Sequence, residues 1–314
     1  KRIYYHDLSR TYYRVSPVKV DHEFIITQAR EESFMKAIEF PEFQAMRTAI
    51  RFMENPKIMN PYGKRIEEKL NWLDIKDDPD ADFLYFVDSP DLFFNHDRVR
   101  KMMFILEKLK VAYTISRDEQ DSGYLARVLG RPRTAAKLKE MNKEMVLKSR
   151  FKHIITTDPH AYIELKQDFV HSDVSIWYLT ELVANKIISF NSKQIHKRRM
   201  KVVFQSSTLL PPRMDSMPIK ILQNIGCDVI FTPYSKDYSL STGEGGGFAL
   251  NYKDDSIRIA NQRLEEAREA GAEAIVSDSP HDFSQLRKAK RKFKSQVKVY
   301  DLLTLVAESL KWTN

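Results

Sequence analysis

Short apolar runs alternate with longer amphipathic stretches along most of the chain after about residue 80. The run 83–87 is typical of a buried strand, and short runs at 112–115 and 153–156 have the same character. Amphipathic stretches at 97–109 and 133–149 predict helices between them. Because apolar strands that alternate with such helices form parallel sheets covered by helices, this half of the chain is predicted to be an α/β unit.

The same order of elements returns in the second half of the chain. The closing helices of the two halves are predicted near 175–187 and at 302–311. The other elements predicted in the second half are a strand at 201–204, a helix at 219–224, a strand at 228–232, a helix at 256–270 and a strand at 274–277.

The first 75 residues stand outside this alternation. Apolar positions between 33 and 53 have helical spacing, and Pro41 is expected to split or kink that helix. We therefore predict three parts: an N-terminal helical arm at 1–75, a first α/β repeat at 76–192 and a second at 193–314.

Three short motifs also recur at a nearly constant distance. Residues 156–162 read Thr-Thr-Asp-Pro-His-Ala-Tyr, and residues 277–283 read Ser-Asp-Ser-Pro-His-Asp-Phe. Ser89 to Thr208, Asp121 to Ser241 and Pro159 to Pro280 give offsets of 119, 120 and 121 residues. One spacing held over three motifs predicts a duplicated domain, with tandem Rossmann-like repeats and one functional loop cluster at the carboxyl ends of the strands of each repeat.

Composition narrows the class of protein. Hydrophobic residues make up 42% and charged residues 30% of 314 residues, as in globular proteins. No apolar run is long enough to span a bilayer, and no signal peptide is evident, so we expect a cytoplasmic protein. Cys227 is the only cysteine, which excludes an internal disulfide and an all-cysteine metal site built from this chain. We expect Cys227 to be a buried structural thiol.

The formal net charge is +8, and positive charge gathers at 193–201 and 287–294. Two interpretations stay open: a solvated face, or a docking patch for an acidic partner subunit or nucleic acid. Neither zinc-finger spacing nor an aromatic RNA-binding signature is present, so nucleic acid is not the expected partner.

The paired motifs resemble the CCG domains found in the B-type subunit of heterodisulfide reductase and in the iron–sulfur subunits of glycolate and glycerol-3-phosphate oxidoreductases. The resemblance covers roughly residues 80–311. In that family each half carries a single cysteine after its first strand, a Cys-Cys-Gly turn and a Cys-Pro-x-Cys turn. Those thiolates hold an iron–sulfur cluster, and the resemblance implies the paired α/β fold.

This sequence keeps the turns of that pattern without its cysteines. Gly123, Gly243, Pro159 and Pro280 remain, whereas all ten expected cysteines are other residues. Because hard oxygens replace soft thiolates poorly, we expect no cluster, no other cofactor and no bound metal. The degenerate cluster positions are Ser89, Asp121, Ser122, Asp158, Ala161, Thr208, Ser241, Thr242, Ser279 and Asp282.

Polar residues of these turns carry alternative interpretations. Asp158, His160, His281 and Asp282 would suit zinc or non-haem iron if the repeats faced one another, or they would cap the following helices. The glycine-rich loop at 241–247 would cradle a phosphate or only keep an inherited turn, and Glu244 would repel an anion there. A hydrolytic triad from Ser279, His281 and Asp282 is not expected, because triads assemble in space rather than in a run.

We therefore expect a non-catalytic, cluster-less structural subunit of a larger redox complex, similar to heterodisulfide reductase, which holds iron–sulfur or flavin subunits. A peripheral place at a membrane complex is left open, and the chain itself is not expected to span a membrane. The alternative is an enzyme or a small-molecule or metal-binding protein that reuses the cleft between the repeats. His160, His281 and Glu244, together with Asp121, Ser122, Asp158 and Asp282, would then line that cleft.

Overall fold

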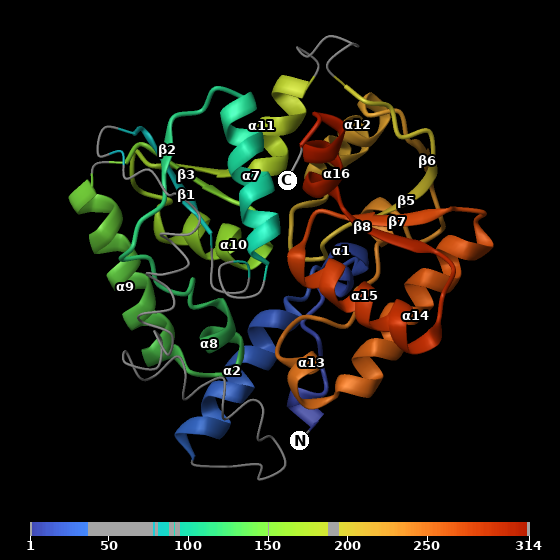
Figure 1. Ribbon diagram of the computed structural model, residues 1–314. Coiled ribbons are helices and arrows are strands. Elements are labelled where there is room, and N and C mark those ends of the chain that lie inside the picture. Colours follow the sequence, from blue (N-terminus) through green and yellow to red (C-terminus); the bar gives the residue numbers. More distant parts are fainter. Residues whose placement is uncertain are drawn as a thin grey trace. The chain divides into compact units, whose positions relative to one another are not determined.

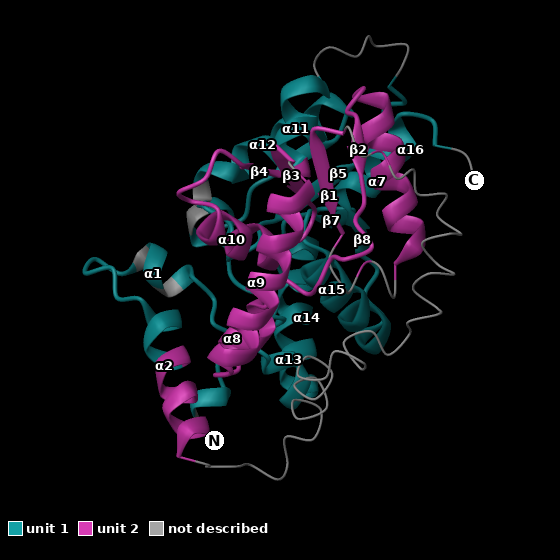
Figure 2. Ribbon diagram, turned by 90° about the vertical axis from the view of Figure 1, so that its left-hand side faces the viewer, with its two compact units in different colours: residues 1–26, 180–314 teal, residues 27–179 magenta. Residues whose placement is uncertain are grey.

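The computed structural model describes residues 2–36, 78, 81–87, 91, 95–149, 151–187 and 195–312, which Figure 1 draws as ribbon. The chain divides into two compact units, coloured separately in Figure 2. Unit 1 joins Lys1–Ile26 to Thr180–Asn314, and unit 2 is Thr27–Leu179. The helix expected over 33–53 lies outside the described residues after Lys36.

Unit 2 contains a four-stranded parallel sheet with the order β2-β1-β3-β4. The strands are β1 (Phe83–Phe86), β2 (Tyr113–Thr114), β3 (His153–Thr156) and β4 (Ser175–Tyr178). The central strands bury Leu84, Phe86, Ile154 and Ile155, so these short apolar runs form the core of the unit. The helices of this part are α2 (His22–Met35), α7 (His96–Lys108), α8 (Tyr124–Val128), α9 (Pro132–Ser149) and α10 (Pro159–Asp168).

Unit 1 repeats this topology, with the parallel order β6-β5-β7-β8. Its strands are β5 (Lys201–Gln205), β6 (Asp228–Ile230), β7 (Ala274–Ser277) and β8 (Lys298–Asp301). Leu264 and Leu286 are fully buried in the core beside β7. Its helices are α1 (Thr11–Val15), α11 (Leu179–Lys186), α12 (Ser216–Asn224), α13 (Phe248–Asn251), α14 (Lys253–Glu269), α15 (Pro280–Phe293) and α16 (Leu302–Ser309), with 3-10 turns at Arg2–Tyr4, Pro212–Asp215 and Lys236–Tyr238.

The predicted fold class is confirmed: the chain is α/β, with two Rossmann-like repeats that each contain a parallel sheet of the same strand order. The boundaries predicted at residues 75 and 192 stay predictions.

One element was predicted wrongly. The stretch 175–187 was expected to be a single helix, but it is strand β4 followed directly by α11. The burial of β4 alternates, with Ile176 and Tyr178 inside and Ser175 exposed, which is the two-residue period of a strand. Because no glycine or proline separates β4 from α11, the apolar positions merge into one apparent helical stripe. Strand β8 was not predicted, although the helix predicted at 302–311 begins where α16 begins.

Candidate functional site

The two Pro-His turns are helix caps at the carboxyl ends of β3 and β7. Asp158 precedes α10, and its Oδ1 accepts a hydrogen bond from the backbone N–H of His160 at 2.7 Å. Ser279 precedes α15, and its Oγ accepts from the backbone N–H of Asp282 at 3.2 Å. Proline occupies the first turn of both helices, where its missing N–H costs nothing. Two positions that carry cysteine in the resembled family therefore satisfy backbone donors here.

In unit 1, two other degenerate positions bond directly to one another. The hydroxyl of Thr242 donates to Oδ1 of Asp282 at 2.5 Å, and both side chains are buried. Oδ2 of Asp282 has no hydrogen-bond partner among the described residues. Burial raises the pKa of Asp282 to about 6, against the opposing effect of the Thr242 hydrogen bond. Two residues at positions where the resemblance implies ligand cysteines are therefore hydrogen-bonded to one another.

The glycine turns are built alike in the two units. Oδ1 of Asp121 accepts from the N–H of Gly123, and Oγ of Ser241 accepts from the N–H of Gly243, each at 2.9 Å. Gly123 and Gly243 have φ values of +81° and +76°, a region that glycine enters without strain. The turns therefore depend on glycine and on a short oxygen-bearing side chain two residues before it.

The remaining degenerate positions that the structure describes are all buried. Ala161 is fully buried in α10, Ser122 is 4% exposed and Thr208 is 7% exposed. Ser89 lies outside the described residues. Hydroxyl groups and a methyl group thus stand where the resemblance implies thiolates.

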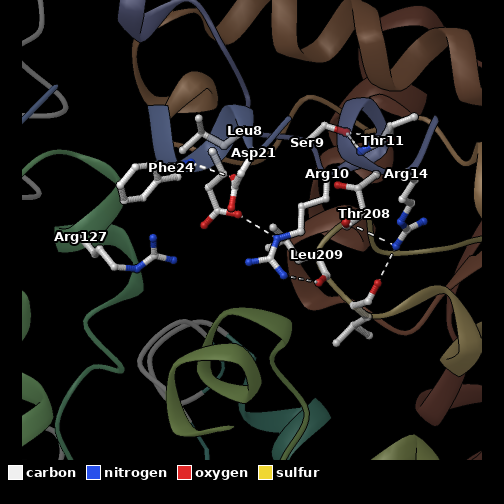
Figure 3. A network of polar contacts seen from close by, with 12 residues as sticks. Leu8, Ser9, Arg10, Thr11, Arg14, Asp21, Phe24, Arg127, Thr208 and Leu209 are labelled. Atoms are coloured by element: carbon white, nitrogen blue, oxygen red, sulfur yellow. Dashed lines mark hydrogen bonds and ion pairs between the residues drawn. The ribbon is translucent and has the colours of Figure 1, made fainter. Parts of the chain in front are cut away.

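The N-terminal segment secures the loop that contains Thr208. Arg14 donates to the carbonyl oxygens of Leu210 at 2.5 Å and Thr208 at 3.4 Å, and Arg10 donates to that of Leu209 at 3.5 Å (Figure 3). Arg10 also pairs with the buried Glu23, with 2.8 Å between Nε and Oε2. Two guanidinium groups therefore hold a loop after β5 by its backbone, which the sequence did not indicate.

The glycine-rich loop is covered by the same segment. A side chain at Gly245 would meet the backbone oxygen of Asp7, and a Cβ at Gly246 would lie 2.7 Å from Cγ of Leu8. This face of the loop therefore contacts protein rather than open solvent, which favours the turn interpretation over a phosphate cradle.

The two histidines and Glu244 are all partly exposed. His160 stacks on Tyr124, with ring centroids 4.0 Å apart and planes 10° apart. His160 belongs to unit 2, whereas His281, Asp282 and Glu244 belong to unit 1. The convergence of these residues in a cleft therefore stays a prediction.

Unit 2 contains a buried ion pair that the sequence analysis missed. Arg98 of α7 pairs with Asp91 and donates to the hydroxyl of Thr157 at 3.0 Å. Both charged side chains are under 10% exposed, and Thr157 directly precedes Asp158. The charges of Asp91 and Arg98 act in opposite directions on Tyr85, whose hydroxyl pKa is raised mainly by burial. A strong charge pair therefore lies beside the first Pro-His turn. Asp91 and Arg98 are seven residues apart in the sequence, and no sequence pattern indicated that they would form a pair.

Unit 1 also buries a group of carboxyls. Burial, reinforced by the charge of Asp215, raises the pKa of Asp278 to about 8, and Asp282 and Asp301 act in the same direction. Thr180 donates to Oδ2 of Asp278 at 3.3 Å. Burial and neighbouring negative charges therefore favour the protonated form of Asp278 at neutral pH.

Cys227 is a buried thiol, as expected. It is 6% exposed, and burial raises its pKa to about 11. A thiol that stays protonated at neutral pH is a weak nucleophile and a weak ligand.

Comparison with known proteins bears on these turns. The family model described as "Cysteine-rich domain" (CCG) matches residues 214–287, a span that includes the glycine turn and the second Pro-His turn. The resemblance to the CCG-domain family is confirmed. Ser241, Thr242, Ser279 and Asp282, for which the resemblance implies cysteines, all lie within the matched span.

Two curated relatives are similar in sequence to most of this chain. The chain is 27% identical over 283 residues to the probable iron-sulfur-binding oxidoreductase FadF of Bacillus subtilis, covering 80% of this chain and 39% of that protein. It is 24% identical over 280 residues to the D-type subunit of the dihydromethanophenazine:CoB–CoM heterodisulfide reductase of Methanosarcina barkeri, covering 80% of this chain and 65% of that protein. The chain therefore spans about two fifths of the first relative and less than two thirds of the second.

Among solved structures, a hypothetical protein from Helicobacter pylori is similar in fold. The match has a TM-score of 0.52 at 11% identity and covers 81% of this chain and 55% of that one. At that identity the match shows the fold alone. Across the part of the chain that the structure describes, none of the helices has the length and apolar character needed to cross a membrane.

Proposed function

We propose that this chain is a non-catalytic, cluster-less structural subunit of a redox complex. The relatives named above are an oxidoreductase and a subunit of heterodisulfide reductase, which supports a place in such a complex. The observation that carries the cluster-less part is the hydrogen bond between Thr242 and Asp282, two positions at which the resembled family carries ligand cysteines.

The local chemistry supports this proposal. A cluster of the family needs several thiolates, and the described turns offer carboxylate and hydroxyl oxygens and the methyl group of Ala161. Four of these side chains already accept hydrogen bonds from backbone N–H groups: Asp121, Asp158, Ser241 and Ser279. Ligand exchange at these positions would break the caps and turns that hold the fold.

Exposed cations on α15 support a docking role for this chain. The last turns of α15 carry exposed cations beyond its buried Leu286 face, and Lys294 ends the helix in a left-handed conformation. A dense positive face favours a partner surface that is acidic. We call this set the α15 basic face: Arg287, Arg291 and Lys294.

The experiment is reconstitution of the redox complex with and without the chain. If the chain is structural, its omission lowers the yield of assembled complex, while the purified partner subunits keep their own clusters and flavins. Charge reversal of Arg287 and Arg291 to Glu should weaken assembly, and reversal of the exposed Arg133 and Lys137 on α9 serves as the matched control. Unchanged assembly and activity without the chain would refute the proposal, and turnover by the chain alone would favour the enzyme alternative.

A further inference from the structure

Unit 1 contains a cavity of about 510 Å³ that no part of the proposed role requires. One wall is the N-terminal segment around Asp7, and a second is the loop region that includes Tyr234 and Tyr238. The third wall is formed by Phe248 of α13 and by Arg263 of α14. A volume of this size falls within the range of small-molecule sites in proteins.

Arg263 is the unusual group in this wall. Its side chain is only 6% exposed, and Nε and Nη1 have no hydrogen-bond partner among the described residues. Its other nitrogen, Nη2, pairs with Glu266 on the same helix. Burying a guanidinium with two unpaired N–H groups costs folding free energy unless an acceptor forms hydrogen bonds with them. Burial lowers the pKa of Arg263, against the opposing effect of Glu266.

The rest of the lining is aromatic. The carbon of the Arg263 guanidinium lies 5.4 Å from the ring centroid of Tyr234, and Tyr234 is 46% exposed. Tyr5 packs edge-on against Phe248, with centroids 5.2 Å apart, and is 53% exposed. Half-exposed rings around a cavity offer flat faces and edges to a second ring.

We propose that this cavity binds a small aromatic carboxylic acid, whose carboxylate accepts hydrogen bonds from Arg263 while its ring packs among Tyr5, Tyr234 and Phe248. Asp7 also lines the cavity, and its negative charge disfavours an anion beside it, whereas the positive charge of Arg263 favours one. Oδ1 of Asp7 already accepts from the N–H of Ser9 at 3.2 Å. Glu266 pairs with Nη2 of Arg263 alone, so the ligand carboxylate would accept from the unpaired Nε and Nη1 groups.

This site is independent of the proposed structural role. It lies within unit 1, and it needs neither the cleft between repeats nor an iron–sulfur cluster. Ser241, a degenerate cluster position, lines the same cavity, so a bound acid would lie next to the inherited turn. A cluster-less subunit would thereby keep a small-molecule site close to the position of its former cofactor.

The test is titration calorimetry of the full chain with benzoate and 4-hydroxybenzoate, with benzylamine as the ligand of opposite charge and phosphate as the anion without a ring. We expect saturable binding of the two carboxylates with one site per chain, and no binding of benzylamine. Arg263→Met should weaken benzoate binding at least about tenfold, the loss expected for a charge-assisted hydrogen bond. Arg258→Met is the matched control, because Arg258 is on the same helix and its side chain is 66% exposed.

A second variant guards against misfolding of Arg263→Met. Ile259→Trp fills the cavity from α14 and leaves the guanidinium in place, so it should also abolish binding while thermal unfolding stays cooperative. Equal binding of benzoate by wild type and both variants, binding of benzylamine as tight as that of benzoate, or an absence of carboxylate binding by wild type would each overturn the proposal. Phosphate binding as tight as that of benzoate would overturn it as well, because it would show an anion site without a role for the rings. None of these results depends on whether the chain assembles into a redox complex.

Discussion

Thr242 donates a 2.5 Å hydrogen bond to Asp282, across forty residues of sequence and at two positions where the resembled family carries cysteine. Thr242 comes from the glycine turn and Asp282 from the first turn of α15. The bond joins the glycine turn of unit 1 to the second Pro-His turn. Under the proposed cluster-less role, this hydrogen bond connects the two turns in place of the cluster that the resemblance implies.

Thr242→Val should destabilise the protein by about 1–3 kcal/mol at pH 7.5, because it leaves a buried carboxylate without its donor. Thr242→Ser keeps the hydroxyl and is the matched control. The measurement is urea unfolding, with the free energy of unfolding extrapolated to water. A valine variant as stable as the serine variant would show that this bond contributes little.

The stability of the protein should fall as pH rises from about 5 to 9. Asp282 and Asp278 have folded-state pKa values raised by burial to about 6 and about 8, above the unfolded value near 4. The folded state therefore binds more protons than the unfolded state in this window. The stabilisation is fully present below the unfolded pKa and is lost as pH rises through each folded pKa.

Asp278→Asn tests that assignment, because an amide cannot ionise. We compare the free energy of unfolding of the variant with that of wild type at two pH values. The difference should favour the variant by at least about 1 kcal/mol more at pH 9 than at pH 5. Asp228→Asn, at an exposed position on β6, should leave the pH profile unchanged. Thermal unfolding across pH measures both, and parallel profiles for wild type and Asp278→Asn would contradict the prediction.

The Arg98–Asp91 pair in unit 2 should behave as a buried ion pair. Arg98→Met alone removes the cation that neutralises the buried charge of Asp91 and should cost about 3–5 kcal/mol of stability. The double variant Arg98→Met with Asp91→Leu should recover most of that loss. Lys152→Met, which breaks an exposed pair with Asp82, is the control and should change stability little. A double variant as unstable as the single one would contradict this account.

The contact between the N-terminal segment and the glycine-rich loop should depend on Gly245. Gly245→Ala places a methyl group against the backbone oxygen of Asp7, so residues 2–15 should become more open to proteolysis and hydrogen exchange. Gly271→Ala is the control: its φ is +75°, but no atom lies within 4 Å of the added Cβ, so only backbone strain changes. Equal protection of residues 2–15 in wild type and Gly245→Ala would refute the contact.

Much of the fold could be predicted from the pattern of the sequence. Buried parallel strands such as β1 and β7 are continuous apolar runs, which identify themselves without context. Strand β4 could not be recognised in this way, because it runs straight into a helix with no turn residue between them, and β8 is only partly buried and is not a continuous apolar run. Their strand character comes from pairing with β3 and β7, which is a tertiary effect.

The cap residues of the candidate site could be predicted from the sequence, but the side-chain contacts of the site could not. Asp158 and Ser279 precede Pro-His and could be recognised as caps from local sequence alone. The Thr242–Asp282 bond, the Arg98–Asp91 pair and the open N–H groups of Arg263 depend on residues brought together by the fold. No local pattern encodes those distances, so the cavity and the buried charges became evident only in three dimensions.

The central claim is that the inherited cluster positions hold no cluster. Iron and acid-labile sulfide analysis of the chain, purified without oxygen and recorded with its absorption spectrum, tests it most directly. We predict neither iron nor sulfide and no visible absorption, in wild type and in Thr242→Val alike. Stoichiometric iron with sulfide, bound by wild type and lost on substitution of Asp158 and Asp282, would contradict the account.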